Sequence, residues 1–540
     1  MAKKKLAIND ISKNPDQQLM DIQQKDLMAL PFDCDSPCEG SAIKPMSDAQ
    51  RERYECSLDG ISVVNIPKAK NKEEEQRVVD SFLSGLRKSL AQDDNWTFWQ
   101  QLMLTLDACV RCQTCNDACP IYISSGKQDY FRPTYRSELL RKIKEKYLDR
   151  GGSFMTKLRG NDIELNYATV VRLAELAYRC TMCRRCAKWC PMGSDNALVT
   201  RELRKIFSQE LGWAPPELHE KGTVKQLQVG ASTGISPDAF MGMVEFMEEE
   251  IEEKTGKKIK IPVDKKGAEI LLIHNTGEYM SWMENPEAFA IIFDAAGVDY
   301  TLSSQVGGYE GTNYGAFYSD PQFARIAVSW IGAAKELGVK KIMAGECGHE
   351  HKSLVSIADR LLVGDTNVPR ESCFPLLKEI VFSGKLKLDP QRNNFPVTLH
   401  DPCNFVRLMG IVEPQREILR YIAPKFREMT PHGVDNYCCG GGSGFAIFQN
   451  MNFPEWRYRL SNRMKMKQVL EAFGDDISPD TKKLVCAPCS NCKGAMRDMF
   501  AFYNAGPKYG IGYTGLVEFI VNAMVDMPEP FIDLDELVMQ

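Results

Sequence analysis

CVRCQTCNDACP at residues 109–120 and CTMCRRCAKWCP at residues 180–191 carry the same cysteine spacing. In each copy, pairs of residues separate the first three cysteines, three residues precede the fourth, and a proline follows it. This spacing is typical of thiolates that hold [4Fe-4S] clusters. Zinc sites usually combine two CxxC pairs, so four cysteines within each short run favour iron–sulfur clusters over zinc or disulfides.

The fourth cysteine of each motif is expected to reach across to the other cluster. One [4Fe-4S] cubane cluster would then be held by Cys109, Cys112, Cys115 and Cys190, and the other by Cys180, Cys183, Cys186 and Cys119. Basic residues lie between these ligands and would offset the negative charge of thiolate-bound clusters; they are Arg111, Arg184, Arg185 and Lys188. The two motifs predict electron transfer.

Apolar residues at helical spacing surround both motifs. They predict helices from Asp93 to Leu106 and over residues 137–148, 167–178 and 197–211. Residues 91–235 should therefore form an all-helical domain around the two clusters. This domain resembles the helical ferredoxin domain of quinone-linked iron–sulfur subunits, such as that of succinate dehydrogenase.

Charge and composition narrow the possible functions. The 540 residues have a formal net charge of −5 with both signs interspersed, so no nucleic-acid-binding surface is expected. The sequence has no apolar run of about 18 residues, which excludes a membrane-spanning helix, and its start lacks the apolar stretch of a signal peptide. Its 19 cysteines fall in metal-like groups of a long chain, which favours a reducing cytoplasm.

Two segments outside these motifs have little apolar periodicity. Residues 1–90 are polar and are expected to form an extended N-terminal arm that lies on partner subunits. Their thiols, Cys34, Cys38 and Cys56, are interpreted as structural or incidental, because no fourth metal ligand is near. Residues 236–266 are expected to form a helix from Pro237 to Lys254 followed by a lysine-rich linker.

The second half of the chain repeats one pattern of strands and helices. Strands expected over residues 270–274, 300–303 and 341–344 recur over 397–400, 428–430 and 484–486. Helices expected over 286–296 and 323–337 recur over 414–422 and 456–473. We predict an α+β multidomain protein in which the helical domain precedes a duplicated α/β unit, with one copy over 267–390 and the other over 391–540.

The two copies differ in their cysteines. The second copy contains Cys403, Cys438, Cys439, Cys489 and Cys492. At four of the aligned positions the first copy has Gly277, Tyr309, Glu310 and Glu350, and at the fifth it retains Cys347. Because one thiolate cannot hold an iron–sulfur cluster, the first copy is expected to be empty and to serve as a packing half or a wall of the substrate cleft.

The cysteines of the second copy, with the turn Cys438-Cys439-Gly440, resemble the cysteine-rich CCG domain of heterodisulfide reductase catalytic subunits. That resemblance implies that these five cysteines hold a noncubane [4Fe-4S] cluster at which a disulfide is cleaved, which makes all five catalytic. Glycines follow the paired cysteines and let the backbone approach the sulfurs. Cys486 forms an overlapping CxxC pair with Cys489, and we prefer Cys489 and Cys492 because Cys486 falls in a buried strand.

Within this family, the arm, the helical domain and the unequal repeats are most similar to the K subunits of the membrane complex of dissimilatory sulfur metabolism. The resemblance implies a membrane cytochrome b subunit and further complex subunits as partners, and electron exchange with a quinone pool. It also implies a small sulfur-carrier protein with redox cysteines near its C-terminus as substrate, in the metabolism of sulfite and sulfate. The chain would then be cytoplasmic and peripheral on the inner face of the membrane.

Several alternatives remain open from the sequence. The same clusters could serve an electron-relay subunit of a system that oxidises glycolate, lactate or glycerol 3-phosphate, or a reductase of a small-molecule thiol heterodisulfide. A zinc site in the second copy and a non-enzymatic scaffold are weaker alternatives. The nearest proton donors in sequence are His400, His432 and Lys493. The direction of electron flow and the roles of Cys347, Cys373 and Cys486 are undetermined.

Overall fold

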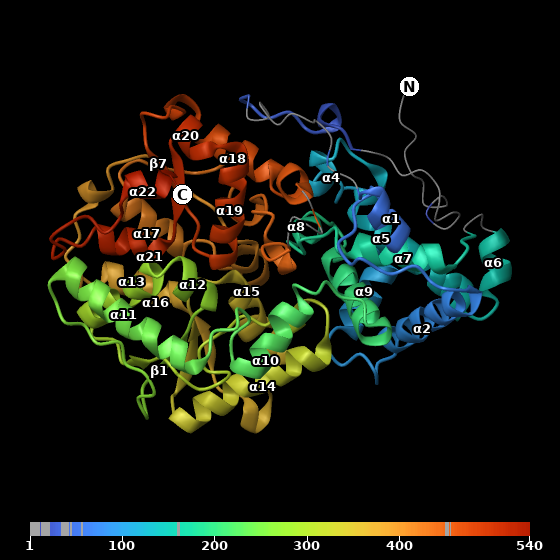
Figure 1. Ribbon diagram of the computed structural model, residues 1–540, viewed down its shortest axis with the longest axis horizontal. Helices are drawn as coiled ribbons and strands as arrows, with labels where there is room; N and C mark the ends of the chain where they lie inside the picture. The colour runs from blue at the N-terminus through green and yellow to red at the C-terminus, as the bar shows by residue number, and fades with distance from the viewer. Residues whose placement is uncertain are drawn as a thin grey trace.

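The computed structural model describes residues 11, 22–33, 43, 46–55, 58–158, 162–448, 453 and 455–539. Figure 1 shows a helical part on the right and two α/β parts on the left, in agreement with the predicted fold class. The cysteines predicted in the N-terminal arm, Cys34, Cys38 and Cys56, lie outside the described residues. Among the described residues, every helix is too short or too polar to cross a bilayer.

The helical domain is arranged around α9 (Asn196–Leu211), which contacts the other helices α2 (Lys72–Leu90), α3 (Trp99–Ala108), α5 (Pro133–Ile143) and α7 (Tyr167–Ala177). The carboxylate of Asp195 accepts hydrogen bonds from the backbone N–H groups of Ala197 and Leu198 and so caps the start of α9. Gly212, with φ of 68°, ends the helix in the left-handed conformation. The helix predicted over residues 197–211 therefore ends at the residue where the structure ends it.

The segment expected as an extended arm is partly helical and packs on its own chain. It contains α1 (Asp48–Arg53) and α2, whose buried side chains face α7 and α9. In the segment between α1 and α2, Ser62 Oγ and the backbone N–H groups of Val63 and Val64 donate hydrogen bonds to the buried carboxylate of Glu175 in α7. Residues 1–90 taken alone do not contain Glu175, which is why their polar composition suggested a free arm.

The first repeat contains a four-stranded parallel sheet in the order β2-β1-β3-β4. Its strands are β1 (Ile270–Ile273), β2 (Tyr300–Thr301), β3 (Lys341–Ala344) and β4 (Arg370–Ser372). Alternate residues of β1 enter different cores: Ile270 and Leu272 join the core shared with the second repeat, whereas Leu271 and Ile273 join the core shared with the helical domain. The first repeat therefore packs against both of the other parts.

The second repeat has the same strand order, β6-β5-β7-β8, and all of its pairs are parallel. Its strands are β5 (Val397–Leu399), β6 (Phe426–Arg427), β7 (Lys483–Cys486) and β8 (Ile511–Thr514). The predicted duplication is confirmed, with two differences: β6 lies before the expected residues 428–430, and the fourth strands β4 and β8 were not predicted. Arg370-Glu371-Ser372 in β4 is polar, and short edge strands of this kind lack a periodic apolar signal.

The remaining helices cover the sheets or connect the parts. Those of the helical part and its link to the sheets are α4 (Pro120–Ser124), α6 (Gly152–Leu158), α8 (Arg185–Lys188), α10 (Lys225–Val229) and α11 (Pro237–Thr255). The first repeat adds α12 (Thr276–Ser281), α13 (Glu284–Ala296), α14 (Asp320–Leu337), α15 (Gly348–Glu350) and α16 (Cys373–Phe382). The second repeat adds α17 (Pro414–Ile422), α18 (Arg463–Phe473), α19 (Ser490–Tyr503), α20 (Ala505–Tyr509), α21 (Leu516–Asn522) and α22 (Leu534–Met539).

The carboxyl ends of β3 and β7 meet at the junction between the repeats. The backbone N–H of Ser490, after β7, donates to the carbonyl of Glu346, after β3, at 2.9 Å. The N–H of Gly348 donates to Cys489 Sγ at 3.1 Å. Open parallel sheets bind ligands at the carboxyl ends of their strands, so this junction is where a site is expected.

Candidate iron–sulfur sites

The structure brings Cys109, Cys112, Cys115 and Cys190 around one small cavity. Burial, together with the neighbouring thiols of Cys109 and Cys190, raises the pKa of Cys115 to about 12. Between the ligands, Arg111 and Gln113 have φ of 60° and 66°, so the backbone turns tightly around the cavity. Because the four thiols lie close together, their thiolate forms would repel one another, and a bound cation or cluster would remove that repulsion.

The other four cysteines of the paired motifs, Cys119, Cys180, Cys183 and Cys186, line a second small cavity. Burial raises the pKa of Cys119 to about 12, and the thiols of Cys183 and Cys180 add to the effect. The backbone N–H of Met182 donates to Cys180 Sγ at 3.3 Å. Both cavities thus contain the crossed sets of cysteines that the spacing predicted, and their donors fit a cubane cluster.

Arg185 joins both motifs to the second repeat. Its Nη1 donates to the carbonyl of Ala118 at 2.8 Å, and its Nε donates to the carbonyl of Asp435 at 2.8 Å. Arg184 instead pairs with Asp195 at 2.8 Å, so its charge is already balanced by a carboxylate. Arg185 therefore holds the cysteine loops in place. The charge of Arg184 is balanced by Asp195, so offsetting the charge of a cluster is not its only role.

The five cysteines of the second repeat form one contiguous group of thiols at the carboxyl end of its sheet. Neighbouring thiols shift one another's pKa in the pairs Cys403 and Cys438, Cys438 and Cys439, Cys439 and Cys492, and Cys492 and Cys489. Cys403 is half-buried and the other four are buried. Five convergent sulfurs exceed the four ligands of a structural zinc site and fit an iron–sulfur cluster.

Backbone N–H groups and glycines surround these sulfurs. The N–H groups of Gly440 and Gly441 donate to Cys438 Sγ and Cys439 Sγ, each at 3.3 Å. Gly440 has φ of 86°, and a Cβ there would lie 2.1 Å from Asn462 Oδ1. The turn therefore requires glycine and directs backbone dipoles at the thiolates, as sulfur ligands of clusters need.

His400 and Lys465 complete the polar surroundings of the CCG thiols. His400 Nε2 lies 3.3 Å from Cys492 Sγ, and His400, Cys439 and Cys492 present ligand atoms within 4.8 Å of one another. Burial lowers the pKa of Lys465 to about 7, against the nearby Asp401 and the thiols, which favour its charged form. Lys465 Nζ donates to Asn436 Oδ1 at 2.6 Å.

Asp401 holds this network in place. Both of its oxygens pair with Arg416, and it accepts from the N–H of Gly433 at 2.7 Å and from Asn436 Nδ2 at 3.2 Å. Sequence reasoning did not identify Asp401, Lys465 or Asn436 as part of the site. The position of Asp401, directly after His400 at the end of a predicted strand, was the available signal.

The structure assigns different surroundings to the overlapping CxxC pairs. Cys486 lies within β7, opposite Leu399 of β5 and Thr514 of β8, and is fully buried. Cys489 and Cys492 lie beyond the strand, within the group of thiols. The arrangement favours the register that the sequence analysis preferred.

The first repeat presents a tyrosine and carboxylates at the aligned positions. Tyr309 OH donates to the carbonyl of Ile235 at 3.0 Å. Burial raises the pKa of Glu310 to about 7 and that of Glu350 well above its ordinary value. Ser232 Oγ donates to Glu310 at 2.7 Å, whereas the Glu350 carboxylate has no hydrogen-bond partner within the part of the chain that the structure describes.

The second cubane site and the CCG site adjoin each other. The thiols of Cys183 and Cys438 lie close enough to shift each other's pKa, although they belong to different parts of the chain. Arg407, which follows Cys403, donates from Nε to the carbonyl of Cys183 at 2.6 Å. Electrons could therefore pass between the two sites through directly contacting ligands.

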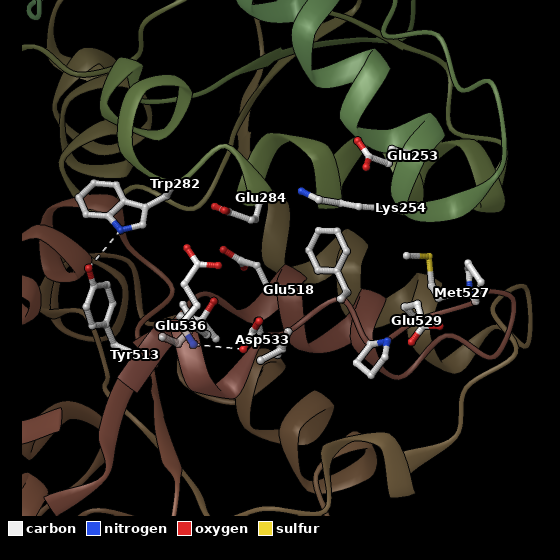
Figure 2. A pocket seen from close by; sticks show the side chains of 16 residues that line it. Glu253, Lys254, Trp282, Glu284, Tyr513, Glu518, Met527, Glu529, Asp533 and Glu536 are labelled. Atoms are coloured by element: carbon white, nitrogen blue, oxygen red, sulfur yellow. Dashed lines mark hydrogen bonds between the residues drawn. The ribbon is translucent and has the colours of Figure 1, made fainter. Parts of the chain in front are cut away.

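A cavity of about 360 Å³ lies on another side of the repeats, and none of these cysteines lines it. Figure 2 shows Trp282 and Tyr513, joined by a hydrogen bond, at one end, and Lys254 among several glutamates farther along. Glu518 lines this cavity and lies 3.4 Å from Lys493 Nζ, which follows Cys492. The cavity thus reaches the CCG site only through a buried ion pair.

A second cavity, of about 240 Å³, lies between the helical domain and the repeats. It is lined by Met182 and Arg184 of the second cubane motif, by Lys352 and Arg360, and by Leu408. Burial lowers the pKa of Lys352 to about 8, and Cys403 is the first charged group that opposes this shift. This basic cavity therefore approaches the CCG thiol that is least buried.

Comparisons with known proteins agree with this geometry. Residues 105–194 match the family model of a 4Fe-4S dicluster domain, and residues 397–497 match that of a cysteine-rich domain known as CCG. The chain is 27% identical over 487 residues to the Hdr-like menaquinol oxidoreductase iron–sulfur subunit 2 of Archaeoglobus fulgidus, covering 82% of this chain and 83% of the relative.

Two further relatives extend the comparison. The D subunit of the dihydromethanophenazine:CoB–CoM heterodisulfide reductase of Methanosarcina acetivorans is 24% identical over 408 residues, which cover 73% of this chain and 89% of the relative. The EtfAB:quinone oxidoreductase of Syntrophomonas wolfei is 21% identical over 423 residues, covering 74% of this chain and 56% of the relative. The chain is thus an iron–sulfur oxidoreductase that contains a CCG domain and is similar to the D subunits of heterodisulfide reductase.

Proposed function

We propose that this chain carries electrons between a membrane quinone-linked cytochrome b partner and a noncubane [4Fe-4S] cluster that reduces, or forms, a disulfide or trisulfide. The observation that carries this proposal is the continuous group of thiols from Cys183, at the second cubane site, to Cys489. Its substrate is a small sulfur-carrier protein of dissimilatory sulfite or sulfate metabolism. The chain lies at the cytoplasmic face of the membrane through further complex subunits.

The cubane sites serve as the path for electrons. The cluster at Cys109, Cys112, Cys115 and Cys190 lies toward the membrane partner, and the cluster at Cys119, Cys180, Cys183 and Cys186 lies next to the CCG site. Cubane clusters pass single electrons, whereas opening an S–S bond takes two. A cluster held by Cys119, Cys180, Cys183 and Cys186 would supply electrons singly, and the contact between Cys183 and Cys438 would connect it to the CCG site.

The CCG residues Cys403, Cys438, Cys439, Cys489 and Cys492 would hold the noncubane cluster. When bound, it supplies iron that can retain a sulfur atom between the two electron transfers. His400 fixes the orientation of Cys492 through its 3.3 Å contact, and Lys465 places a cation beside the thiolates. Asp401, which pairs with Arg416 and Asn436, holds both His400 and Lys465 in place.

The substrate reaches the CCG site from the basic cavity. Cys403 is the least buried of the five thiols, and Lys352, in that cavity, is within electrostatic range of it. Arg360 also lines the cavity, so its charge favours an anionic segment of the carrier protein. The acidic cavity around Glu518 is separated from the thiols by the Lys493 ion pair and does not serve this purpose.

A second candidate function follows from the similarity to the EtfAB:quinone oxidoreductase. In that case the chain would relay electrons from a flavin partner, for example in a system that oxidises glycolate, lactate or glycerol 3-phosphate, and would not act on sulfur bonds. The similarity to the D subunit of heterodisulfide reductase covers more of the relative and favours disulfide chemistry. A small-molecule thiol heterodisulfide is a third possible substrate.

Metal analysis tests the cluster content. Chain purified without oxygen should contain about twelve irons and as many acid-labile sulfides, as three [4Fe-4S] clusters require. Electron paramagnetic resonance (EPR) of the oxidised form should show a signal separate from those of the reduced cubanes. Zinc, or only about eight irons, would contradict the proposal.

Replacement of Cys439 tests where the chemistry occurs. Cys439→Ser should abolish reduction of a carrier-protein trisulfide while both cubane EPR signals persist. The complex should be assayed with carrier trisulfide, with a small-molecule heterodisulfide, and with glycolate or lactate plus an electron acceptor. Undiminished trisulfide reduction by Cys439→Ser, or turnover of hydroxy acids alone, would contradict the proposal.

A further inference from the structure

Cys347 is the one cysteine that the first repeat retains at a position aligned with the CCG set. It lies beyond the carboxyl end of β3, begins α15, and is fully buried. We propose that Cys347 is a further thiolate ligand of the CCG cluster, contributed by the repeat that faces it. This inference rests on the proposed cluster at the five CCG cysteines.

Contacts across the junction carry the proposal. The thiols of Cys347 and Cys489, the CCG cysteine that precedes α19, lie close enough for each to shift the pKa of the other. The adjacent N–H of Gly348 also donates to Cys489 Sγ, at 3.1 Å. Cys347 therefore extends the group of touching thiols from five members to six.

The surroundings of the Cys347 sulfur are those of a thiolate. Asn491 Nδ2 lies 3.3 Å from it, the N–H of Glu350 lies 3.5 Å away, and Asn275 Nδ2 lies 3.7 Å away. These donors come from three different segments, and one of them, Asn491, belongs to the CCG repeat itself. Burial raises the pKa of the Cys347 thiol in the absence of metal, but several donors directed at one buried sulfur are what a thiolate ligand requires once it is bound.

Cys486 provides an internal comparison. It is as deeply buried as Cys347, yet within the described chain its sulfur accepts no hydrogen bond from a side chain or backbone N–H group. It packs within β7 among apolar side chains of the shared core. Cys486 therefore has the surroundings of a cysteine that only fills space, whereas Cys347 does not.

The duplication explains how a residue of the first repeat reaches the cluster. Cys347 and Cys489 both lie three residues beyond their strands, β3 and β7, which end at Ala344 and Cys486. Because the carboxyl ends of these strands meet, the aligned cysteines face each other. The first repeat is therefore more than a wall: it contributes one side of the binding site.

Ligation by Cys347 has a defined chemical balance. The thiol releases its proton, its sulfur lone pair forms a bond to a cluster iron, and no electron is gained or lost. The added negative charge disfavours the reduced cluster, so loss of this ligand should raise the reduction potential. The bond would also join the two repeats through the cluster.

The test compares Cys347→Ser with Cys486→Ser in the full holoprotein, purified without oxygen. Cys347→Ser should change the g-values of the oxidised CCG signal and raise its midpoint potential, or lose about four irons, while both cubane signals stay unchanged. Cys486→Ser should leave g-values, potential and iron content as in the wild type. The intact cubane signals show that each variant has folded.

Asn491→Ala offers a milder variant that keeps every sulfur. It removes the nearest donor to Cys347 and should lower the midpoint potential of the same signal by a small amount, because a hydrogen bond to a thiolate ligand offsets its negative charge. Wild-type g-values, potential and iron content in Cys347→Ser would overturn the inference. Wild-type protein with only about eight irons would instead refute the CCG cluster itself, so the two failures are distinguishable.

Discussion

The two α/β repeats have the same strand order and the same parallel pairing, yet their sites differ completely. At the carboxyl end of the second sheet, five thiols touch one another beside Lys465 and His400. At the aligned places in the first sheet, Glu310 and Glu350 are buried carboxyls. The sheet fixes where a site forms, and a few side chains beyond the strands decide what it can hold.

Charge balance explains why the two sites remain distinct. Thiolates of the second repeat can be stabilised by backbone N–H groups of Gly440 and Gly441, and Lys465 lies nearby with a pKa that burial lowers to about 7. In the first repeat, Glu310 accepts hydrogen bonds from Ser232, whereas Glu350 has no hydrogen-bond partner among the described residues, and burial raises the pKa of both, which favours their neutral forms. The site of the second repeat therefore suits negatively charged ligand groups, whereas the aligned place in the first repeat suits neutral groups.

The largest expected effect comes from substituting aligned residues of the two repeats. Cys492→Ala should remove about four irons per chain and abolish trisulfide reduction, because the CCG cluster loses a ligand. Glu350→Gln, at the aligned position of the first repeat, should keep the iron content and the EPR signals. Iron analysis and EPR of the two variants check this. Equal losses of iron in both would contradict the contrast between the repeats.

A second comparison uses the residues that follow β1 and β5. Asp401→Ala should lower the free energy of unfolding by about 3 kcal/mol, because it leaves the buried Arg416 with only its partner Glu428. Asn275→Ala, in the first repeat, should cost about 1 kcal/mol, because it removes the cap of α12 at Gly277. Thermal unfolding without oxygen measures both. A larger loss in Asn275→Ala would reverse the expected order.

The pH dependence of stability should distinguish the carboxyls of the first repeat. Burial raises the pKa of Glu310 to about 7, so the folded state binds more protons than the unfolded state between about pH 4.5 and 7. Stability from this group is therefore present at low pH and is lost as the pH rises through this window, by up to about 3 kcal/mol.

Glu310→Gln removes the titratable carboxyl and should flatten the dependence of stability on pH. Its amide oxygen can still accept a hydrogen bond from Ser232. The measurement is the melting temperature of wild type and variant between about pH 6 and 8, where clusters survive. The wild type should lose stability across this range relative to the variant. Parallel profiles would show that Glu310 does not titrate there.

The smallest effect is expected at buried cysteines outside both sites. Cys373→Ala, at the start of α16, should lower the free energy of unfolding by about 1 kcal/mol through lost packing. Iron content and trisulfide reduction should be those of the wild type. Loss of iron in this variant would show that the group of thiols extends further into the first repeat than its contacts indicate.

The sequence was informative wherever spacing along the chain sets the geometry. The motifs at residues 109–120 and 180–191 predicted which cysteines share a cavity, and the repeat of strands predicted two similar sheets. It was less informative for segments whose partners are distant in sequence. The polar composition of residues 1–90 suggested an arm that lies on partner subunits, because Glu175, which accepts hydrogen bonds from Val63 and Val64, lies more than a hundred residues later.

Two features of the CCG site also escaped prediction for this reason. Lys465 reaches the thiols from α18, and Cys347 reaches Cys489 from the other repeat. Lys465 forms part of no motif, and the alignment of the repeats marked Cys347 without showing that it lies beside Cys489. Their positions depend on how the two sheets turn their carboxyl ends toward each other.

The sequence by itself determined the class of cofactor, the crossed assignment of the cubane ligands and the duplication, because each depends on residues a few positions apart or on a repeated order of elements. Only the tertiary structure decided that Cys183 touches Cys438 and that Cys347 touches Cys489. Such contacts join segments far apart in the chain, and they arise only when buried apolar faces pack the three parts together.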